Sequence, residues 1–172
     1  MSDGATVLAL PELGAVAIRG ADAVRFLQGQ LSQNVERVSP QLSLLAGYHN
    51  AQGRVIAVLR LVSLGDGELL AVLPRELAPT VVARLSKFVL RSKVTIADES
   101  GRWQLHGIVE DAPAQWPRSR DAQVVAGEGR IVCVAESLPR WLRVTPRGTR
   151  EPQLSASASD AWRRHEIADG EP

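Results

Sequence analysis

The chain has 172 residues, and its 20 Lys and Arg residues nearly balance its 19 Asp and Glu residues. This length corresponds to one domain, or to one domain with a small second part. A near-neutral charge argues against a protein dedicated to electrostatic DNA binding. The single cysteine, Cys133, excludes an internal disulfide and a cysteine-rich zinc or iron–sulfur site. No apolar run reaches the ~18 residues of a membrane span, so we expect a soluble, cytoplasmic protein without a membrane partner.

The first forty residues contain two strand-like runs and one helix-like pattern. The apolar runs 6–10 and 15–19 flank the turn-forming sequence Pro11-Glu12-Leu13-Gly14, and together they predict a β-hairpin. Beyond Asp22, apolar residues recur with helical spacing at Val24, Leu27, Leu31 and Val35. This pattern predicts a helix whose apolar face lies in the core, with Asp22 either capping it or interacting favourably with the positive end of its dipole.

Residues 42–73 change to the alternation of strands. Runs at 44–48, 54–62 and 69–73 are separated by Asn50-Ala51-Gln52-Gly53 and Gly65-Asp66-Gly67, both of which have turn chemistry. We therefore predict a three-stranded antiparallel meander. Both faces of the middle run are apolar, which is typical of a central strand covered on both sides.

The rest of the chain mixes helices and strands. We expect a second helix with Pro79 in its first turn and with a core-facing stripe of Leu77, Val81, Leu85 and Phe88. Strand-like runs follow at 94–97, 103–110, 122–126, 130–135 and 141–145, and a last helix is expected from Ser157 or Ser159 through Trp162 to Ile167. Because the elements do not alternate as βαβ units, the fold class is α+β, built on a mixed, mainly antiparallel sheet with packed helices.

Few side chains have the spacing of a catalytic or metal site. Cys133 lies in an alternating apolar run, which predicts a packed thiol rather than a nucleophile. The histidines His49, His106 and His165 are far apart, so their spacing predicts no metal site. His106 is expected to be structural, whereas His49 precedes a turn and is either a solvated loop residue or part of a site.

Two polar clusters lie beside strongly apolar elements. The first is Gln28-Gly29-Gln30 with Ser32-Gln33-Asn34, and the second is His49-Asn50 with Gly53-Arg54. Amides offer paired donors and acceptors that suit the edge of a heterocyclic ring, and an arginine suits an anionic tail. The alternatives are a solvated helix face for the first cluster and a purely structural turn for the second, where Arg54 has the least structural reason to be present. The binding candidates are Gln28, Asn34, Asn50 and Arg54.

Several segments, in this order, resemble the opening of YgfZ-type folate-binding proteins, which are relatives of the glycine-cleavage T-protein, an aminomethyltransferase. They are residues 20–22 (GAD), 26–35 (FLQGQLSQNV), 50–54 (NAQGR), 87–96 (KFVLRSKVTI) and a closing W…I-x-x-G-x-P element that runs from Trp162 to Pro172. The resemblance implies tetrahydrofolate in a central cavity, and we expect the four candidates to face it because they are polar and lie beside apolar elements. It also implies a soluble, cytoplasmic protein linked to tRNA modification and to the upkeep of iron–sulfur enzymes, with such enzymes acting on tRNA as partners.

The resemblance further implies a folate-binding-like α+β domain over residues 1–110 and a second, incomplete α+β segment over 111–172. The T-protein branch carries an acidic pair in its meander, and the matching positions here are Ala57 and Val58. Neither side chain can hydrogen-bond a folate nitrogen or guide a proton. Another carboxylate of that branch falls on Ala168. We therefore expect the YgfZ branch, and no catalytic residue.

The YgfZ branch also carries a K-G-C-x-x-G-Q-E signature beyond the W…P element, and this sequence stops before it. Cys133 comes too early to be the signature cysteine. We expect the chain to correspond to the N-terminal two thirds of a family member, with an incomplete folate site.

Three functions follow as hypotheses. The leading one is a non-enzymatic folate-binding module. The second is a one-carbon transferase, which needs a carboxylate where Ala57 and Val58 stand. The third is a protein- or tRNA-interaction module that uses a basic edge, formed by Arg140, Arg143, Arg147 and Arg150.

Overall fold

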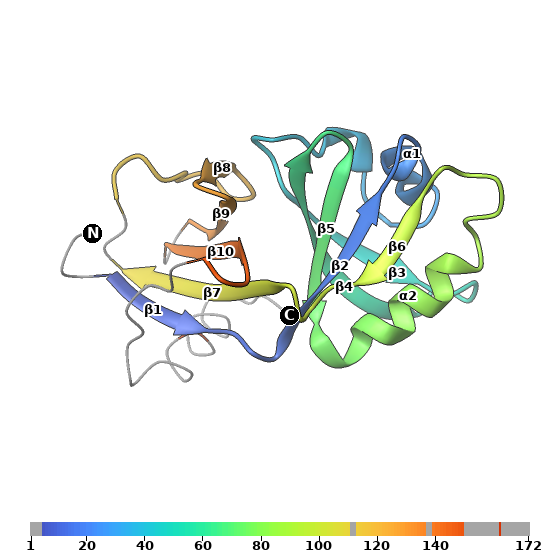
Figure 1. Cartoon of the computed structure of the whole chain (residues 1–172), viewed down its shortest axis with the longest axis horizontal. Coiled ribbons are helices and arrows are strands. Elements are labelled where there is room, and N and C mark those ends of the chain that lie inside the picture. The colour runs from blue at the N-terminus through green and yellow to red at the C-terminus, as the bar shows by residue number, and fades with distance from the viewer. Residues whose placement is uncertain (1–4, 111–112, 137–138, 150–161, 163–172) are drawn as a thin grey trace. The chain divides into compact units, whose positions relative to one another are not determined.

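The computed structural model describes residues 5–110, 113–136, 139–149 and 162 (Figure 1). The chain forms two compact units, a central unit of residues 12–102 and a terminal unit that joins residues 1–11 to residues 103–172. This grouping differs from the division after residue 110, because the strands at 5–9 and 103–110 pair with each other. The assignment of folate binding to residues 1–110 stays a prediction.

The central unit contains an antiparallel sheet and two α-helices. Its elements are β2 (Leu13–Arg19), α1 (Ala23–Gln28), a 3₁₀ turn (Val35–Arg37), β3 (Leu44–His49), β4 (Val55–Gly65), β5 (Glu68–Pro74), a second 3₁₀ turn (Arg75–Leu77), α2 (Ala78–Ser86) and β6 (Thr95–Asp98). The strand order is β3-β4-β5-β2-β6, and all the pairs are antiparallel. The predicted meander is confirmed as β3-β4-β5. Gly65 and Gly67, at φ +100 and +74, allow its tight β4–β5 turn.

The predicted hairpin at the start of the chain is wrong. β1 (Ala5–Ala9) pairs with β7 (Trp103–Glu110), whereas β2 lies between β5 and β6. β2 is buried along its whole interior and has a hydrogen-bonded neighbour on each side, which a hairpin with β1 would not provide. The sequence Pro11 to Gly14 therefore marks the passage from the terminal unit to the central unit rather than a reversal.

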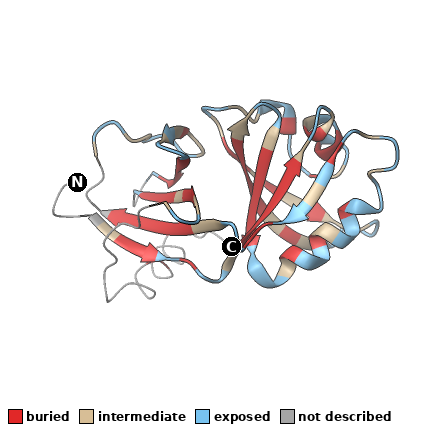
Figure 2. Ribbon diagram, viewed as in Figure 1, coloured by how far each residue is buried: buried red, intermediate tan, exposed pale blue. Residues whose placement is uncertain are grey.

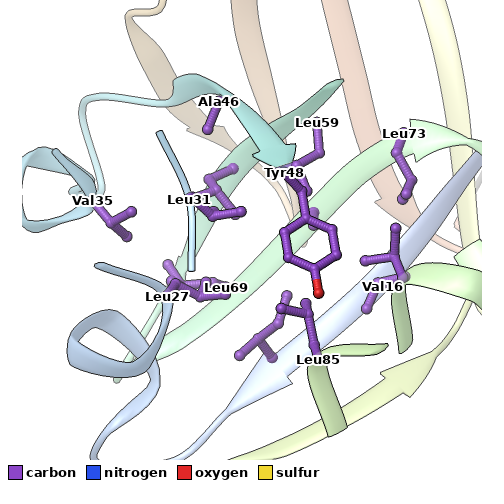
Figure 3. Close-up of a cluster of buried hydrophobic side chains, with 14 of the residues drawn as sticks. Val16, Leu27, Leu31, Val35, Ala46, Tyr48, Leu59, Leu69, Leu73 and Leu85 are labelled. Atoms are coloured by element: carbon purple, nitrogen blue, oxygen red, sulfur yellow. The ribbon is translucent and has the colours of Figure 1, made fainter. Parts of the chain in front are cut away.

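The core of the central unit lies between one face of the sheet and the helices (Figures 2 and 3). Its buried members include Val16, Leu27, Leu31, Val35, Ala46, Tyr48, Leu59, Leu69, Leu73 and Leu85. Figure 3 shows the Tyr48 ring reaching from β3 into the middle of this aliphatic cluster. In β4, every residue from Leu59 to Ser63 is buried, which confirms a central strand covered on both faces.

The first helix is shorter than its pattern predicts. α1 ends at Gln28, yet Leu27, Leu31 and Val35 are all buried, so the predicted core face is retained. The chain leaves the helix after Gly29 because the Ser32 N–H donates to the Gly47 carbonyl at 2.9 Å. Asp22 makes no capping hydrogen bond; its carboxylate accepts from the Lys93 backbone N–H at 2.8 Å instead.

The second helix confirms most of its predicted stripe. Pro79 lies in the first turn of α2, and Val81 and Leu85 are buried. Phe88 is a correction, since it lies beyond the helix end and is 53% exposed. The helix ends at Ser86, and Val89 rather than Phe88 packs against the core.

The terminal unit is built on a second antiparallel sheet. Its strands are β1, β7, β8 (Gln123–Ala126), β9 (Gly129–Ala135) and β10 (Arg140–Pro146), in the order β1-β7-β10-β9-β8. One face carries a cluster of Val7, Ile108, Ile131, Cys133 and Trp141. Together the two sheets confirm the α+β class.

Trp162 lies against β7 of the terminal unit. A Cβ atom added to Gly107 would come within 2.4 Å of the Trp162 ring, so the missing side chain makes room for the indole. The Arg140 guanidinium lies 5.1 Å from the centre of the same ring. Trp162 is helical and buried, as predicted, while the rest of the predicted last helix lies outside the described residues.

No helix in the described ranges is long and apolar enough to cross a membrane.

Candidate functional site

The two polar clusters predicted from the sequence lie side by side along strand β3. Leu31 forms a β-bridge with Tyr48, and the Gly47 backbone N–H donates to the Ser32 side-chain oxygen at 3.1 Å. The segment after α1 is thereby hydrogen-bonded to β3, which ends at the turn containing the second cluster. We call residues 28–34 and 47–54 together the β3 edge site.

Within the first cluster, Gln28 and Asn34 have different local roles. Gln28 is exposed, and its side-chain oxygen accepts from the Val35 backbone N–H at 2.6 Å. This bond holds the chain where it enters the 3₁₀ turn. Because the oxygen is used, the amide nitrogen is the group that Gln28 can offer to a ligand. Asn34 begins that turn without a side-chain capping bond, and its side chain is exposed.

Within the second cluster, Asn50 holds the β3–β4 turn. Its side-chain oxygen accepts from the backbone N–H groups of Gln52 at 3.0 Å and Arg54 at 2.9 Å. Gly53 has a φ of +78, which a glycine adopts without strain. Asn50 therefore stabilises the turn, which was the alternative to a role in ligand binding. Arg54 is exposed at the end of the turn.

His49 and Gly47 join these residues at the same edge. A Cβ atom on Gly47 would lie 2.5 Å from Cε1 of His49 and 2.9 Å from the Ser32 side-chain oxygen. The bare Gly47 backbone therefore lets the imidazole fold back over β3 beside Ser32. Ser32 belongs to the first polar cluster predicted from the sequence, whereas Gly47 was not a candidate, although a glycine inside a strand signals close approach of another group.

Ala57 and Val58 lie on β4, next to this edge, but on opposite faces of the sheet. Ala57 pairs with Tyr48, is 2% exposed and belongs to the helix-covered core. Val58 pairs with Gly47 and is half-buried on the other face. Of the two positions, only Val58 shares a face with Gly47, and neither supplies a group that can exchange a proton.

The strongest charge cluster of the central unit is satisfied internally. Arg19 donates to the Glu68 carboxylate at 2.5 Å and to both oxygens of Glu99 at 2.7 and 2.9 Å. The hydrogen bond to Glu99, followed by the nearby charge of Glu68, raises the pKa of Arg19 above its ordinary value. Arg102 adds a 3.0 Å bond to Glu99. This cluster ties β2 to the ends of β5 and β6 and offers no uncompensated charge to a ligand.

The other sequence candidates are structural. Cys133 is fully buried, which confirms the packed thiol, and His106 is buried in β7, as expected. His165 lies outside the described residues. Within the part of the chain that the structure describes, no group of His, Cys, Asp and Glu side chains is placed to hold a metal ion.

The described arginines of the predicted basic edge, Arg140, Arg143 and Arg147, do not form one exposed surface. Arg140 is fully buried, and Arg143, three positions along β10, points to the opposite face of the sheet. Burial lowers the pKa of Arg143 from its ordinary value. Arg147 is exposed, while Arg150 lies outside the described residues. Strand alternation separates side chains that the sequence places close together.

The chain is similar in sequence to curated bacterial proteins. It is 27% identical over 183 residues to the tRNA-modifying protein YgfZ of Colwellia psychrerythraea, covering 96% of this chain and 55% of the relative. It is 28% identical over 151 residues to the protein of the same name from Escherichia coli O157:H7, covering 84% of this chain and 46% of the relative. The chain is thus similar to YgfZ proteins over most of its own length. No family model matches it.

The fold is similar to that of an aminomethyltransferase. The glycine cleavage system aminomethyltransferase T from Bartonella henselae superposes with a TM-score of 0.70 at 13% identity, over 96% of this chain and 46% of that chain. A heterotetrameric sarcosine oxidase from Corynebacterium sp. U-96 superposes with a TM-score of 0.54 at 10% identity, covering 83% of this chain and 75% of that one. The resemblance to the YgfZ and T-protein group is thus confirmed, and the chain spans about half the length of the curated relatives it matches.

Proposed function

We propose that this chain is a tetrahydrofolate-binding part of a tRNA-modifying protein and that it binds the folate without transferring its one-carbon group. Two similarities support the role: the YgfZ relatives are named for tRNA modification, and the fold is shared with an aminomethyltransferase. In this proposal the whole protein acts in the cytoplasm and supports iron–sulfur enzymes that modify tRNA.

The observation that carries the proposal is the apolar pair on β4. One-carbon transfer needs an acid positioned at the reacting nitrogen of the folate. The resemblance places that acid at Ala57 or Val58. Ala57 is sealed in the aliphatic core, and Val58 presents only carbon atoms beside Gly47. Without a carboxylate at either position, the chain would bind the folate but would not transfer its one-carbon group.

The β3 edge site has the chemistry that a folate requires. A pterin needs amide donors and acceptors at its ring edge and an apolar surface against its face, whereas the glutamate tail needs a cation. Asn34 and the amide nitrogen of Gln28 supply the polar groups, Val58 an apolar surface, and Arg54 the cation. Asn50 supplies mainly the turn that positions Arg54, because its oxygen accepts two backbone bonds.

Calorimetric titration of the chain with tetrahydrofolate tests this proposal. We expect Arg54→Ala to weaken binding about tenfold, since a charge-assisted hydrogen bond is lost. Asn34→Ala should weaken it about fivefold. Arg91→Ala and Gln41→Ala are matched controls, because both residues are exposed and lie outside residues 28–34 and 47–54.

The outcomes separate the site from the function. Unchanged affinity in both Arg54→Ala and Asn34→Ala would reject the β3 edge site, and absence of any binding would reject the folate role. Turnover of a one-carbon tetrahydrofolate by the unmodified chain would instead support the transferase hypothesis and overturn the assignment as a non-catalytic module.

A further inference from the structure

The segment from the last turn of α2 to the start of β6 concentrates positive charge. Residues 84–93 contain the cations Arg84, Lys87, Arg91 and Lys93 and no carboxylate, whereas the rest of the chain holds 16 Lys and Arg against 19 Asp and Glu. All four cationic side chains are exposed. The chain is therefore locally basic within an otherwise slightly acidic molecule. Cations near a helix C-terminus stabilise its dipole, but Arg91 and Lys93 lie well beyond the end of α2.

The same segment exposes two large apolar side chains. Phe88 is 53% exposed and Leu90 is 88% exposed. Between them, Val89 packs against the core of the central unit, so its two neighbours point outward. Leu90 also has a φ of +42, a left-handed conformation that costs free energy for a residue other than glycine. Neither exposure nor strain stabilises the fold.

Hydrogen bonds hold the segment in this shape. The Ser92 backbone N–H donates to the Val89 carbonyl at 2.7 Å, which closes a turn around Leu90. At the far end, the Lys93 backbone N–H donates to the Asp22 carboxylate at 2.8 Å. Gly20 approaches so closely that an added Cβ would contact the Lys93 carbonyl oxygen at 2.0 Å. The cations and apolar side chains are thus presented by an ordered loop, which lowers the entropic cost of binding a partner.

We propose that residues 84–93 form an RNA-binding surface, in which the four cations contact phosphates and Phe88 stacks on an unpaired base. Positive charge without interleaved carboxylates, combined with an exposed aromatic ring, is the combination that binds single-stranded nucleic acid. The inference deepens the proposed function, because it rests on a role in tRNA modification and names the surface that meets the RNA.

Fluorescence anisotropy with a labelled tRNA transcript tests the surface. For the double variant Arg91→Ala/Lys93→Ala, we expect at least a tenfold loss of affinity near 0.1 M salt and a salt dependence that is shallower by about 1.4 in log–log slope. Phe88→Ala should weaken binding about tenfold without changing this slope, because stacking involves no counterion release.

Matched variants keep the test specific. The double variant Arg25→Ala/Arg37→Ala removes two exposed arginines of the same unit, and Val125→Ala removes an apolar side chain that is 62% exposed. Both should bind RNA like the unmodified chain. Arg91→Ala/Lys93→Ala and Phe88→Ala should also retain the tetrahydrofolate affinity of the unmodified chain. The RNA-binding proposal and the folate-binding proposal can therefore fail independently.

Two results would overturn the inference. One is RNA binding that is absent or is insensitive to the loop variants. The other is displacement of the tRNA by polyglutamate as effectively as by unlabelled tRNA at equal charge, which would identify the surface as one for an acidic protein.

Discussion

In the described residues, the two sheets have five strands each but different cores. In the central unit, α1 and α2 cover a large cluster of mostly aliphatic side chains. In the terminal unit, the largest fully buried side chains are Trp141 and Arg140, and Trp141 belongs to a cluster on one face of the sheet. Arg140 lies against Trp162, whose ring occupies the space above Gly107. The central core is thus mostly aliphatic and covered by helices, whereas the core of the terminal unit also contains an arginine and two tryptophan rings.

The largest loss of stability is expected on removal of the Trp162 ring from the terminal unit. Trp162→Ala removes the indole from Gly107 and from the Arg140 guanidinium. Removing a buried tryptophan costs about 3–5 kcal/mol, and the cation–π contact adds about 0.5–2 kcal/mol. Urea denaturation should show a loss of this size in the free energy of unfolding.

A glycine pair provides the control for this contact. Gly107→Ala should destabilise the protein as well, because the added methyl group would lie 2.4 Å from the Trp162 ring, whereas nothing lies within 4 Å of an added methyl group on Gly101. If Gly107→Ala and Gly101→Ala unfold at the same urea concentration, the seating of Trp162 on β7 is wrong.

In the central unit, the sharpest contrast is between the two faces of β4. Ala57→Asp places a carboxyl in the aliphatic core, whereas Val58→Asp places one on a half-buried face. Burial raises the pKa of a carboxyl by about 3 units, which corresponds to about 4 kcal/mol of lost stability at neutral pH. We expect that loss for Ala57→Asp, a smaller one for Val58→Asp, and transfer activity for neither.

The pH dependence of Ala57→Asp has a definite sign. The introduced carboxyl would have a higher pKa in the folded than in the unfolded protein, where it is about 3.9. The folded variant therefore binds more protons, and its stability relative to the unmodified chain should be greatest below about pH 4 and fall as the pH rises. Denaturation curves across this range that run parallel to those of the unmodified chain would place position 57 outside the core.

The contrast between the units also explains what sequence patterns could predict. The meander was predictable because its strands are consecutive and its turns carry glycine. The pairing of β1 with β7 was not, since the partners are about 100 residues apart and nothing local favours that pairing over a hairpin. Phe88 fits the helical period, yet it is exposed because α2 ends before it and Val89 takes the inward position.

The candidate site shows the same limit. Sequence chemistry singled out Gln28, Asn34, Asn50 and Arg54, but only the pairing of residues 31–32 with β3 brings the two clusters together. The role of Asn50 in the turn was visible from its neighbours. The position of the His49 ring over Gly47 was not visible from the sequence, because it depends on the packing of Ser32 and His49 around Gly47 on β3.

A smaller effect should separate the two polar residues of the β3–β4 turn. Asn50→Ala removes the acceptor of two backbone N–H groups and should cost about 1–2 kcal/mol in the free energy of unfolding. Arg54→Ala should leave stability within about 0.5 kcal/mol, because this side chain is exposed. Thermal unfolding of both variants, with Gln52→Ala as an exposed control, measures the difference. Equal losses for Asn50→Ala and Arg54→Ala would contradict the separation of a turn residue from a ligand residue.

The smallest effect concerns Tyr48, whose ring lies in the central core. Burial raises the pKa of Tyr48 above 10.0, although the positive charge of Arg84 opposes the shift. Because the folded pKa exceeds the unfolded one, the contribution of this phenol to stability is complete below about pH 10 and is lost as the pH rises through the folded value. Tyr48 is the only tyrosine in the chain, so phenolate absorbance reports its ionisation directly. The absorbance should rise later than in the urea-unfolded chain, and Tyr48→Phe should flatten the alkaline loss of stability. If the phenol titrated at the same pH in the folded and the unfolded chain, the Tyr48 ring would be exposed to water and would not belong to the central core.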